Sequence, residues 1–90
     1  MTDSEVVELF LDPKSKNMAF HYIVKKYQKK IYFHIRRMVI DHDDADDLLQ
    51  DTFIKVWNHL DTFKNNAALY TWIYRIATNE CLNFLKKLKN

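Results

Sequence analysis

The chain contains no glycine and a single proline, Pro13, in 90 residues. Tight β-hairpin turns and phosphate-binding loops need residues with a positive φ, a conformation that glycine adopts without steric penalty. The sequence therefore argues against hairpin-rich folds and glycine-loop nucleotide sites, and it favours helices joined by Asp and Asn turns. Hydrophobic residues make up 48% of the chain, which is enough for one small packed core. We expect a single domain over residues 1–90, because the chain is too short for two.

Four segments carry apolar residues at the three- and four-residue spacing of an amphipathic helix. The first, Ser4–Leu11, is short and should end at Asp12, because the residue before a proline disfavours the helical conformation. The second is predicted to begin at Asn17, whose side chain can cap a helix, and to end near Val39.

The third helix is predicted to have Asp43 or Asp44 as its N-cap, with further aspartates in the first turn, where the helix dipole favours negative charge. It should run to about Leu60. A polar connector follows, and the last helix is expected from about Ala67 toward the C-terminus. The predicted fold is all-α, a small bundle of three main helices plus a short N-terminal helix.

Charged residues are separated into blocks along the chain. Residues 21–40 carry six Lys or Arg and no acid, whereas residues 41–62 carry seven Asp and one Lys. Such blocks favour two partners, one polyanionic and one basic. Helices of one bundle that attract each other would produce the same pattern, so the sequence leaves both interpretations open.

The last helix has two sides of different chemistry when its residues are placed at 100° intervals. The apolar side comprises Leu69, Ile73, Ala77, Cys81, Phe84 and Leu88. The other side comprises Trp72, Arg75, Asn79, Asn83 and Lys86, with Glu80 elsewhere. Aromatic rings stack on bases, cations bind phosphates and amides pair with base edges, so this side suits nucleic acid. The alternative is that Trp72 belongs to the edge of the core and the rest is ordinary surface.

No metal, cofactor or catalytic site emerges from the residue types and their spacing. The acidic run starts like a calcium loop, but Ala45, Asp46 and Thr52 stand where such a loop needs a ligand, a glycine and a glutamate. One Cys and four scattered His give no pair at zinc-ligand spacing, and neither serine lies in a glycine-flanked nucleophile turn. We expect a protein that uses no cofactor or metal and is not an enzyme. Clustered carboxylates leave a small nucleic-acid-processing enzyme as one alternative.

The expected compartment follows from the cysteine content and the N-terminus. The single Cys81 cannot form an internal disulfide, and the acidic N-terminal segment lacks the pattern of a signal peptide. No run approaches the roughly 18 uncharged apolar residues of a membrane span. These features favour a soluble, cytoplasmic protein with no membrane partner.

Residues 44–57, DADDLLQDTFIKVW, resemble an Asp-Ala-Glu-Asp-Leu-x-Gln-Glu-Thr-Phe-x-x-x-Trp signature, and residues 69–79, LYTWIYRIATN, resemble a Thr-Trp-Leu-Tyr-Arg-Ile-Ala-x-Asn element. Both belong, in this order, to region 2 of bacterial sigma factors of the extracytoplasmic-function group. Phe20, Tyr27 and Ile31-Tyr32 are also similar to the family's earlier helix. The resemblance covers nearly the whole chain.

The resemblance implies a domain for transcription initiation and promoter recognition with two partners. In the family, the acidic helix binds the clamp coiled coil of the largest RNA polymerase subunit. Here this implies a polymerase-binding set of Asp47, Gln50, Asp51 and Trp57. The alternative is a helical protein-interaction module that does not bind DNA.

The second implied partner is the promoter minus-ten element, whose non-template strand the family melts, captures by an extruded base and holds single-stranded. The loop and its pocket would comprise Lys64, Asn65, Asn66, Ala67, Ala68, Leu69 and Tyr70. The helix residues facing DNA would be Trp72, Arg75, Ile76, Asn79, Asn83 and Lys86. Stacking and phosphate contacts can offset the few kcal/mol that extruding a base costs.

Some positions depart from the family pattern. Leu69 stands where the family often has Phe, Asn83 replaces a common Asp, and Lys86-Lys87 replaces an Arg pair, which removes bidentate contacts to phosphate. Nothing in the chain resembles the linker and the helix-turn-helix domain, region 4, that reads the minus-thirty-five element. We expect a fragment of a longer factor that is monomeric when free, and an anti-sigma factor is a further candidate partner.

Overall fold

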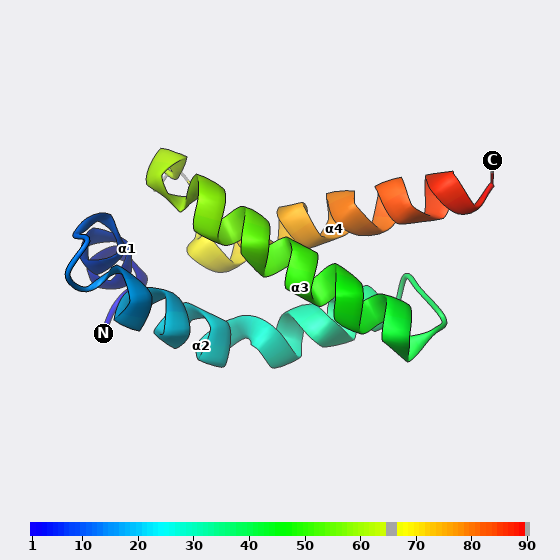
Figure 1. The fold of residues 1–90 in the computed structure, drawn as a ribbon, viewed down its shortest axis with the longest axis horizontal. Helices are drawn as coiled ribbons and strands as arrows, with labels where there is room; N and C mark the ends of the chain where they lie inside the picture. Colours follow the sequence, from blue (N-terminus) through cyan, green and yellow to red (C-terminus); the bar gives the residue numbers. More distant parts are fainter. Residues whose placement is uncertain (65–66, 90) are drawn as a thin grey trace.

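The structure is a computed structural model that describes residues 1–64 and 67–89. Its helices are α1 (Asp3–Leu11), α2 (Lys16–Arg36), α3 (His42–His59) and α4 (Leu69–Leu88), with a short 3₁₀ helix, η1 (Leu60–Thr62), after α3. The described residues contain no strand, and the prediction of an all-α bundle is confirmed. Helices α2 and α4 run in the same direction and α3 runs opposite to both (Figure 1). Each of these three helices packs on the other two, and α1 packs on α2 and η1.

Two predicted N-caps are wrong, by two residues in α2 and by two or three residues in α3. Helix α3 is capped by Asp41, whose side chain accepts a hydrogen bond of 2.7 Å from the Asp43 backbone N–H. Aspartates at 41, 43 and 44 can all cap a helix, and the preceding turn selects the first of them. Helix α2 has Ser15 at its N-cap position, and Asn17 lies inside the helix.

The connection between α1 and α2 explains why Ser15 occupies that position. Helix α1 ends at Leu11, as predicted, and the residues around Pro13 form a turn in which the Ser15 N–H donates to the Asp12 carbonyl. The Ser15 Oγ donates to the Leu9 carbonyl at 2.7 Å. The hydroxyl therefore satisfies the end of α1 instead of capping α2. At its other end α2 stops at Arg36, before the predicted Val39.

The core lies where the helices meet. Its largest fully buried side chains are Phe10, Ile23, Ile31, Ile35, Leu60, Leu69, Ile73, Val6, Val56, Thr52 and Cys81. On α4 the predicted apolar side is buried from Leu69 to Cys81, whereas Phe84 is half-buried and Leu88 is exposed. No helix among the described residues is both long and apolar enough to cross a lipid bilayer.

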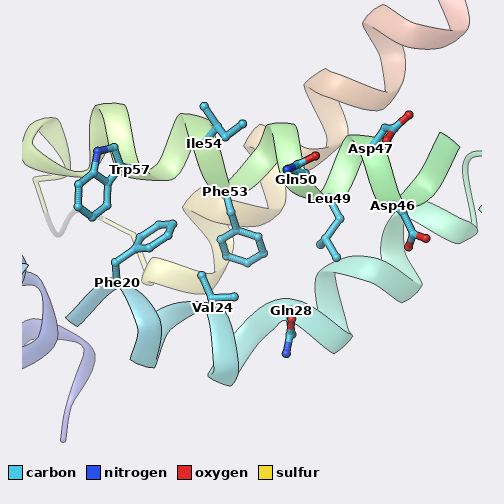
Figure 2. A pocket seen from close by; sticks show the side chains of 10 residues that line it. All are labelled: Phe20, Val24, Gln28, Asp46, Asp47, Leu49, Gln50, Phe53, Ile54 and Trp57. Atoms are coloured by element: carbon cyan, nitrogen blue, oxygen red, sulfur yellow. The ribbon is translucent and has the colours of Figure 1, made fainter. Parts of the chain in front are cut away.

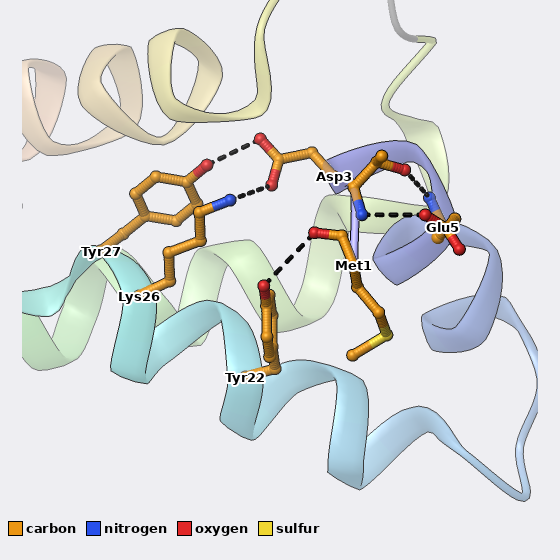
Figure 3. Close-up of polar contacts among 7 residues, drawn as sticks. Met1, Asp3, Glu5, Tyr22, Lys26 and Tyr27 are labelled. Carbon is orange, nitrogen blue, oxygen red and sulfur yellow. Dashed lines mark hydrogen bonds and ion pairs between the residues drawn. The ribbon is translucent and has the colours of Figure 1, made fainter.

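Helix α1 is fastened to α2 by a polar cluster at its N-terminus (Figure 3). The Asp3 carboxylate accepts hydrogen bonds from the Tyr27 hydroxyl at 2.7 Å and from Lys26 Nζ at 2.9 Å. Thr2 and Glu5 form a reciprocal capping box that satisfies the start of α1. Burial opposes ionisation of Asp3, but the hydrogen bonds from Tyr27 and Lys26 outweigh it and hold the pKa of this carboxyl below its usual value.

Candidate nucleic-acid and protein interfaces

An open groove of about 560 Å³ lies between α2 and α3 (Figure 2). We call it the α2–α3 groove; its lining residues are Phe20, Val24, Gln28, Asp46, Asp47, Leu49, Gln50, Phe53, Ile54 and Trp57. Apolar side chains from both helices point toward one another across it, and the two aspartates lie at the end nearest the start of α3. The groove combines an apolar floor with an acidic margin, which suits a basic amphipathic partner helix.

The four predicted polymerase-binding residues have different environments in the structure. Asp47, Gln50 and Asp51 are all exposed on α3, but Asp51 does not line the α2–α3 groove. Ile54, which sequence reasoning missed, lines the groove and is 51% exposed. The sequence signal that could have identified it is an isoleucine that lies outside the buried face of the predicted helix.

Trp57 has a different environment from the other three. It is half-buried, and its ring makes edge contacts with the rings of Phe10 at 5.5 Å and Phe20 at 5.1 Å. Lys16 Nζ lies over the same ring, 4.4 Å from its centroid. Trp57 therefore links α1, α2 and α3 and offers only its outer part to the groove.

The residues predicted for the nucleic-acid side of α4 lie mostly at the surface of the bundle. Arg75, Asn79, Asn83 and Lys86 are exposed, and Ile76 is half-buried. Trp72 is half-buried and packs on Phe63, with ring centroids 5.5 Å apart. Phe63 belongs to the chain segment before α4 and covers one side of the indole. The alternative that Trp72 lies at the edge of the core therefore applies to that side of the ring, and the other side remains accessible.

Glu80 does not contribute negative charge to that side. Its Oε1 lies 2.7 Å from Lys55 Nζ on α3, and the side chain is only 14% exposed. The lysine ammonium therefore compensates this buried carboxylate oxygen. The ion pair fastens α3 to α4 and leaves the outer side of α4 free of acids.

The residues predicted for the loop and pocket do not share one surface. Lys64 and Ala68 are exposed and Ala67 is half-buried, while Asn65 and Asn66 lie outside the described residues. Leu69 is 2% exposed and packs in the core, so the predicted direct contact of this side chain with DNA is not available in the described conformation. Its place in the apolar stripe of α4 is the reason.

Tyr70 points toward α2, away from the Trp72 side of α4. Its ring centroid lies 5.5 Å from that of Tyr27 and 5.8 Å from that of Tyr74. Lys30 Nζ lies 5.7 Å from the Tyr70 centroid. Helix positions 70 and 72 differ by about 200° around the axis, so the two aromatic residues serve different faces.

A buried polar cluster that sequence reasoning missed joins α2 to α4. His34 stacks on Tyr74 with centroids 3.6 Å apart, and its Nε2 lies 2.7 Å from Thr78 Oγ1. The Thr78 hydroxyl donates to the Tyr74 carbonyl, so it accepts from His34 and fixes the Nε2–H tautomer. Burial, with a smaller effect of the Arg37 charge, lowers the pKa of His34 and so favours the neutral ring.

Ion pairs between helices do not neutralise the charge blocks of the sequence. The ion pairs of the described residues join Lys26 to Asp3, Lys55 to Glu80, and His42 to its neighbours Asp43 and Asp46. No ion pair in this part of the chain links the basic residues of α2 to the aspartates of α3. Close ion pairs between α2 and α3 therefore do not account for the charge blocks.

One group of side chains with metal-ligand atoms occurs in the described residues. The ligand atoms of His42, Asp43 and Asp46 lie within 4.8 Å of one another at the start of α3. All three residues are exposed, and the position of the aspartates in the first turn is explained by the helix dipole. We assign no metal site to them.

The chain matches the Sigma-70 region 2 family over residues 23–90. It is 39% identical over 85 residues to the ECF RNA polymerase sigma-E factors of Salmonella typhimurium and Escherichia coli (strain K12), and 36% identical to that of Haemophilus influenzae. These alignments cover 94% of this chain but 43% of each relative, so the chain spans less than half of their length. A similar solved structure is the NMR complex of an engineered region 2 of sigmaE with GTAAAA. Its TM-score is 0.84 at 37% identity, and the match covers 97% of this chain and 88% of that one.

Proposed function

The chain belongs to the Sigma-70 region 2 family, and from this premise we propose that it binds the clamp coiled coil of RNA polymerase and holds the melted non-template strand of a promoter minus-ten element. The family itself confirms the resemblance drawn from residues 44–57 and 69–79. The partners, the melting step and the contact residues are the proposal. In this role the domain acts by binding alone, as a cytoplasmic non-enzymatic factor.

The observation that carries the proposal is the separation of charge on the bundle. Acidic residues border the α2–α3 groove on one face, whereas the outer side of α4 carries Arg75 and Lys86 and no acid among its described residues. A basic helix and a nucleic-acid strand can therefore be bound at the same time. A sigmaE region 2 that was solved with GTAAAA supports the nucleic-acid half of the proposal.

We propose that Asp47 and Gln50 receive the coiled coil at the acidic end of the α2–α3 groove. Both are exposed and both line it, and Ile54 adds an apolar contact one turn further along α3. Asp51 adds negative charge beside the groove, and Trp57 supports its far end from the core. Charge attraction would then speed association, and the apolar floor would supply affinity.

Binding of a clamp coiled-coil fragment to the purified domain tests the polymerase half. We expect Asp47→Ala and Gln50→Ala each to weaken binding about tenfold or more, as residues near the centre of an interface do. Glu8→Ala, which removes an exposed acid on α1, is the matched control and should change binding less than twofold. If the folded domain did not bind the fragment, the interaction-module alternative with another basic partner would be favoured.

The DNA half is tested on α4 with two substitutions of different kinds. Asn79→Ala removes an amide suited to a base edge and should change the order of preference among promoter sequences. Lys86→Ala removes a phosphate contact and should weaken binding to all sequences while flattening the salt dependence. Measured affinities for a panel of single-stranded promoter oligonucleotides separate the two effects. Identical losses on every sequence in both variants would contradict base recognition by Asn79.

A further inference from the structure

The basic residues of α2 have no assigned partner in the function proposed above. Three cations of this helix and its C-cap follow one another at spacings of four and seven, which places them along one flank: Lys26, Lys30 and Arg37. This flank adjoins Tyr70 and Tyr74 of α4, since Lys30 lies over Tyr70 and His34 stacks on Tyr74. We call the three flank residues and the two tyrosines the α2–α4 seam.

We propose that the α2–α4 seam is a second contact surface for the same single strand of DNA, which continues over it from the loop before α4. The inference rests on the proposed function, because the strand must first be held by the loop and α4. It assigns phosphate contacts to Lys30 and Arg37 and base or sugar contacts to Tyr70 and Tyr74.

The aromatic rings of the seam pack on buried side chains that are themselves held by hydrogen bonds. Four rings follow in sequence through space: Tyr27 to Tyr70 at 5.5 Å, Tyr70 to Tyr74 at 5.8 Å, and Tyr74 to His34 at 3.6 Å. Tyr27 and His34 are buried, and each is held by a hydrogen bond, to Asp3 and Thr78 respectively. The half-exposed rings of Tyr70 and Tyr74 therefore present edges or faces in fixed positions, which lowers the entropy lost on stacking a base.

Two charges of the seam, those of Lys30 and Arg37, are free for phosphates. Residues 21–40 contain no acid, and Asp3 of α1 is already held by Lys26 and Tyr27. The single acid of α4, Glu80, is paired with Lys55 on the α3 side. The described ion pairs include neither Lys30 nor Arg37.

The seam begins next to the loop that is proposed to hold the DNA strand. Tyr70 lies in the first turn of α4, immediately after the loop, and it carries the Lys30 ammonium over its ring. A strand leaving the loop on this side meets Tyr70 first and Tyr74 one turn later. Alternating cations and rings along a groove are the arrangement by which proteins follow unpaired strands.

The test compares two kinds of oligonucleotide by fluorescence anisotropy. The short probe is GTAAAA, and the long probes carry six additional thymidines at one end or at the other. We expect extension at one end to tighten binding by about fivefold or more, because stacking and phosphate contacts are sequence-tolerant. Lys30→Gln and Arg37→Gln should each remove most of that gain and leave the affinity for GTAAAA within twofold. Each should also lower the salt slope for the long probe by about 0.7 for every phosphate that is no longer neutralised.

Lys25→Gln is the matched control. Lys25 is exposed and its substitution removes the same charge, but five helical positions place it about 140° around α2 from Lys30. Binding of both probes should stay within twofold of the unchanged protein. Amide chemical shifts of Tyr70 and Tyr74 provide a second measurement on the unchanged protein, and they should move further with the long probe than with GTAAAA.

The outcomes separate this inference from the function beneath it. If GTAAAA binds and neither extension tightens binding, the seam is not a strand contact and the proposed function stands. A gain that persists in both Lys30→Gln and Arg37→Gln would also overturn the inference. If the folded protein binds no probe, the nucleic-acid half of the proposed function fails, and the inference fails with it.

Discussion

The two flanks of α2 face different chemistry although they belong to one helix. On one flank Phe20, Val24 and Gln28 meet α3 across the α2–α3 groove, which has acids at its margin. On the other flank Lys30 meets Tyr70 of α4, in the α2–α4 seam, which lacks acids of its own. The same apolar stripe of α2 supports both surfaces from the core.

The comparison shows how the charge blocks are used. The aspartates of α3 and the cations of α2 lie on neighbouring helices, yet the ion pairs of the described residues do not join them. Exposed ion pairs contribute little to stability, so these charges can be directed at partners at small cost to the fold. The predictions that follow separate residues that hold the two surfaces in place from residues that only face solvent there.

The largest effect is expected at Trp57, where the groove meets the core. Trp57→Ala removes ring contacts to Phe10 and Phe20 and should lower the free energy of unfolding by about 3 kcal/mol. Urea unfolding followed by circular dichroism measures it. The control is Ile54→Ala in the same groove, which is 51% exposed and should cost less than about 1 kcal/mol. Equal losses in both variants would place Trp57 with the surface residues.

Thr78→Val, at a residue beneath the seam, should give the next largest loss in the free energy of unfolding. The change removes the acceptor of the His34 Nε2–H and leaves a buried donor unsatisfied, at a cost of about 2 kcal/mol. Thr71→Val, on the outer part of α4, controls for the change in helix propensity. Thermal or urea unfolding of both variants at pH 7.5 is the measurement. A neutral result for Thr78→Val would mean that stacking on Tyr74 alone orients the imidazole.

His34 should also make stability depend on pH. Burial and the Arg37 charge lower its folded pKa below the unfolded value of about 6.5, so the unfolded chain binds more protons in this range. Stability is therefore full above about pH 6.5 and should fall as the pH decreases toward the folded pKa. Unfolding midpoints between pH 7.5 and 5 test this, and His34→Gln should remove the dependence. A midpoint that rises on acidification would contradict the assigned neutral tautomer.

Asp3→Asn is expected to have a smaller effect, at the end of α2 where α1 is fastened. The change weakens the contacts with Lys26 and Tyr27 and should cost about 1 kcal/mol, a modest value because the ion pair is partly exposed. The folded pKa of Asp3 is lowered, so this stabilisation is complete above about pH 4 and is lost as the pH falls through the folded pKa. Glu8→Gln, an exposed acid on the same helix, should leave both stability and its acid dependence unchanged.

The smallest effects are expected where the two surfaces face solvent. Asp47→Asn and Lys30→Gln should each change the free energy of unfolding by less than about 0.5 kcal/mol. The double variant should be additive, since no ion pair of the described residues joins these positions. Coupling above about 0.5 kcal/mol would show that the blocks attract each other within the bundle and would undo the comparison.

Helix number, order and approximate length were predictable from the residues alone. Apolar periodicity located all four helices, and Pro13 located the end of the first. The predicted caps failed at Asn17 and at Asp43 or Asp44, because several neighbouring residues can cap a helix and the turn geometry selects one. On α4, the sequence distinguished the buried side from the polar side.

The candidate site was predictable only in part. Exposed positions such as Gln50, Asn79 and Lys86 follow from helical spacing together with the family resemblance. The burial of Leu69 and the turn of Tyr70 toward α2 do not, because adjacent residues at a helix start diverge by about 100° and the neighbouring helix decides which is covered. The link from His34 to Thr78 spans two helices far apart in sequence, and local periodicity carries no information on such a pair.

The sequence by itself determined that this protein is a helical bundle of the region 2 type. A chain without glycine and with apolar residues at helical spacing can bury its core only by packing helices. The tertiary structure alone decided which flank of α2 meets α3 and which meets α4, and hence that acids gather beside a groove and cations beside two tyrosines. The physical reason is that charge and exposure on a surface depend on how helices are rotated against each other, and that rotation is set by side-chain packing between distant segments.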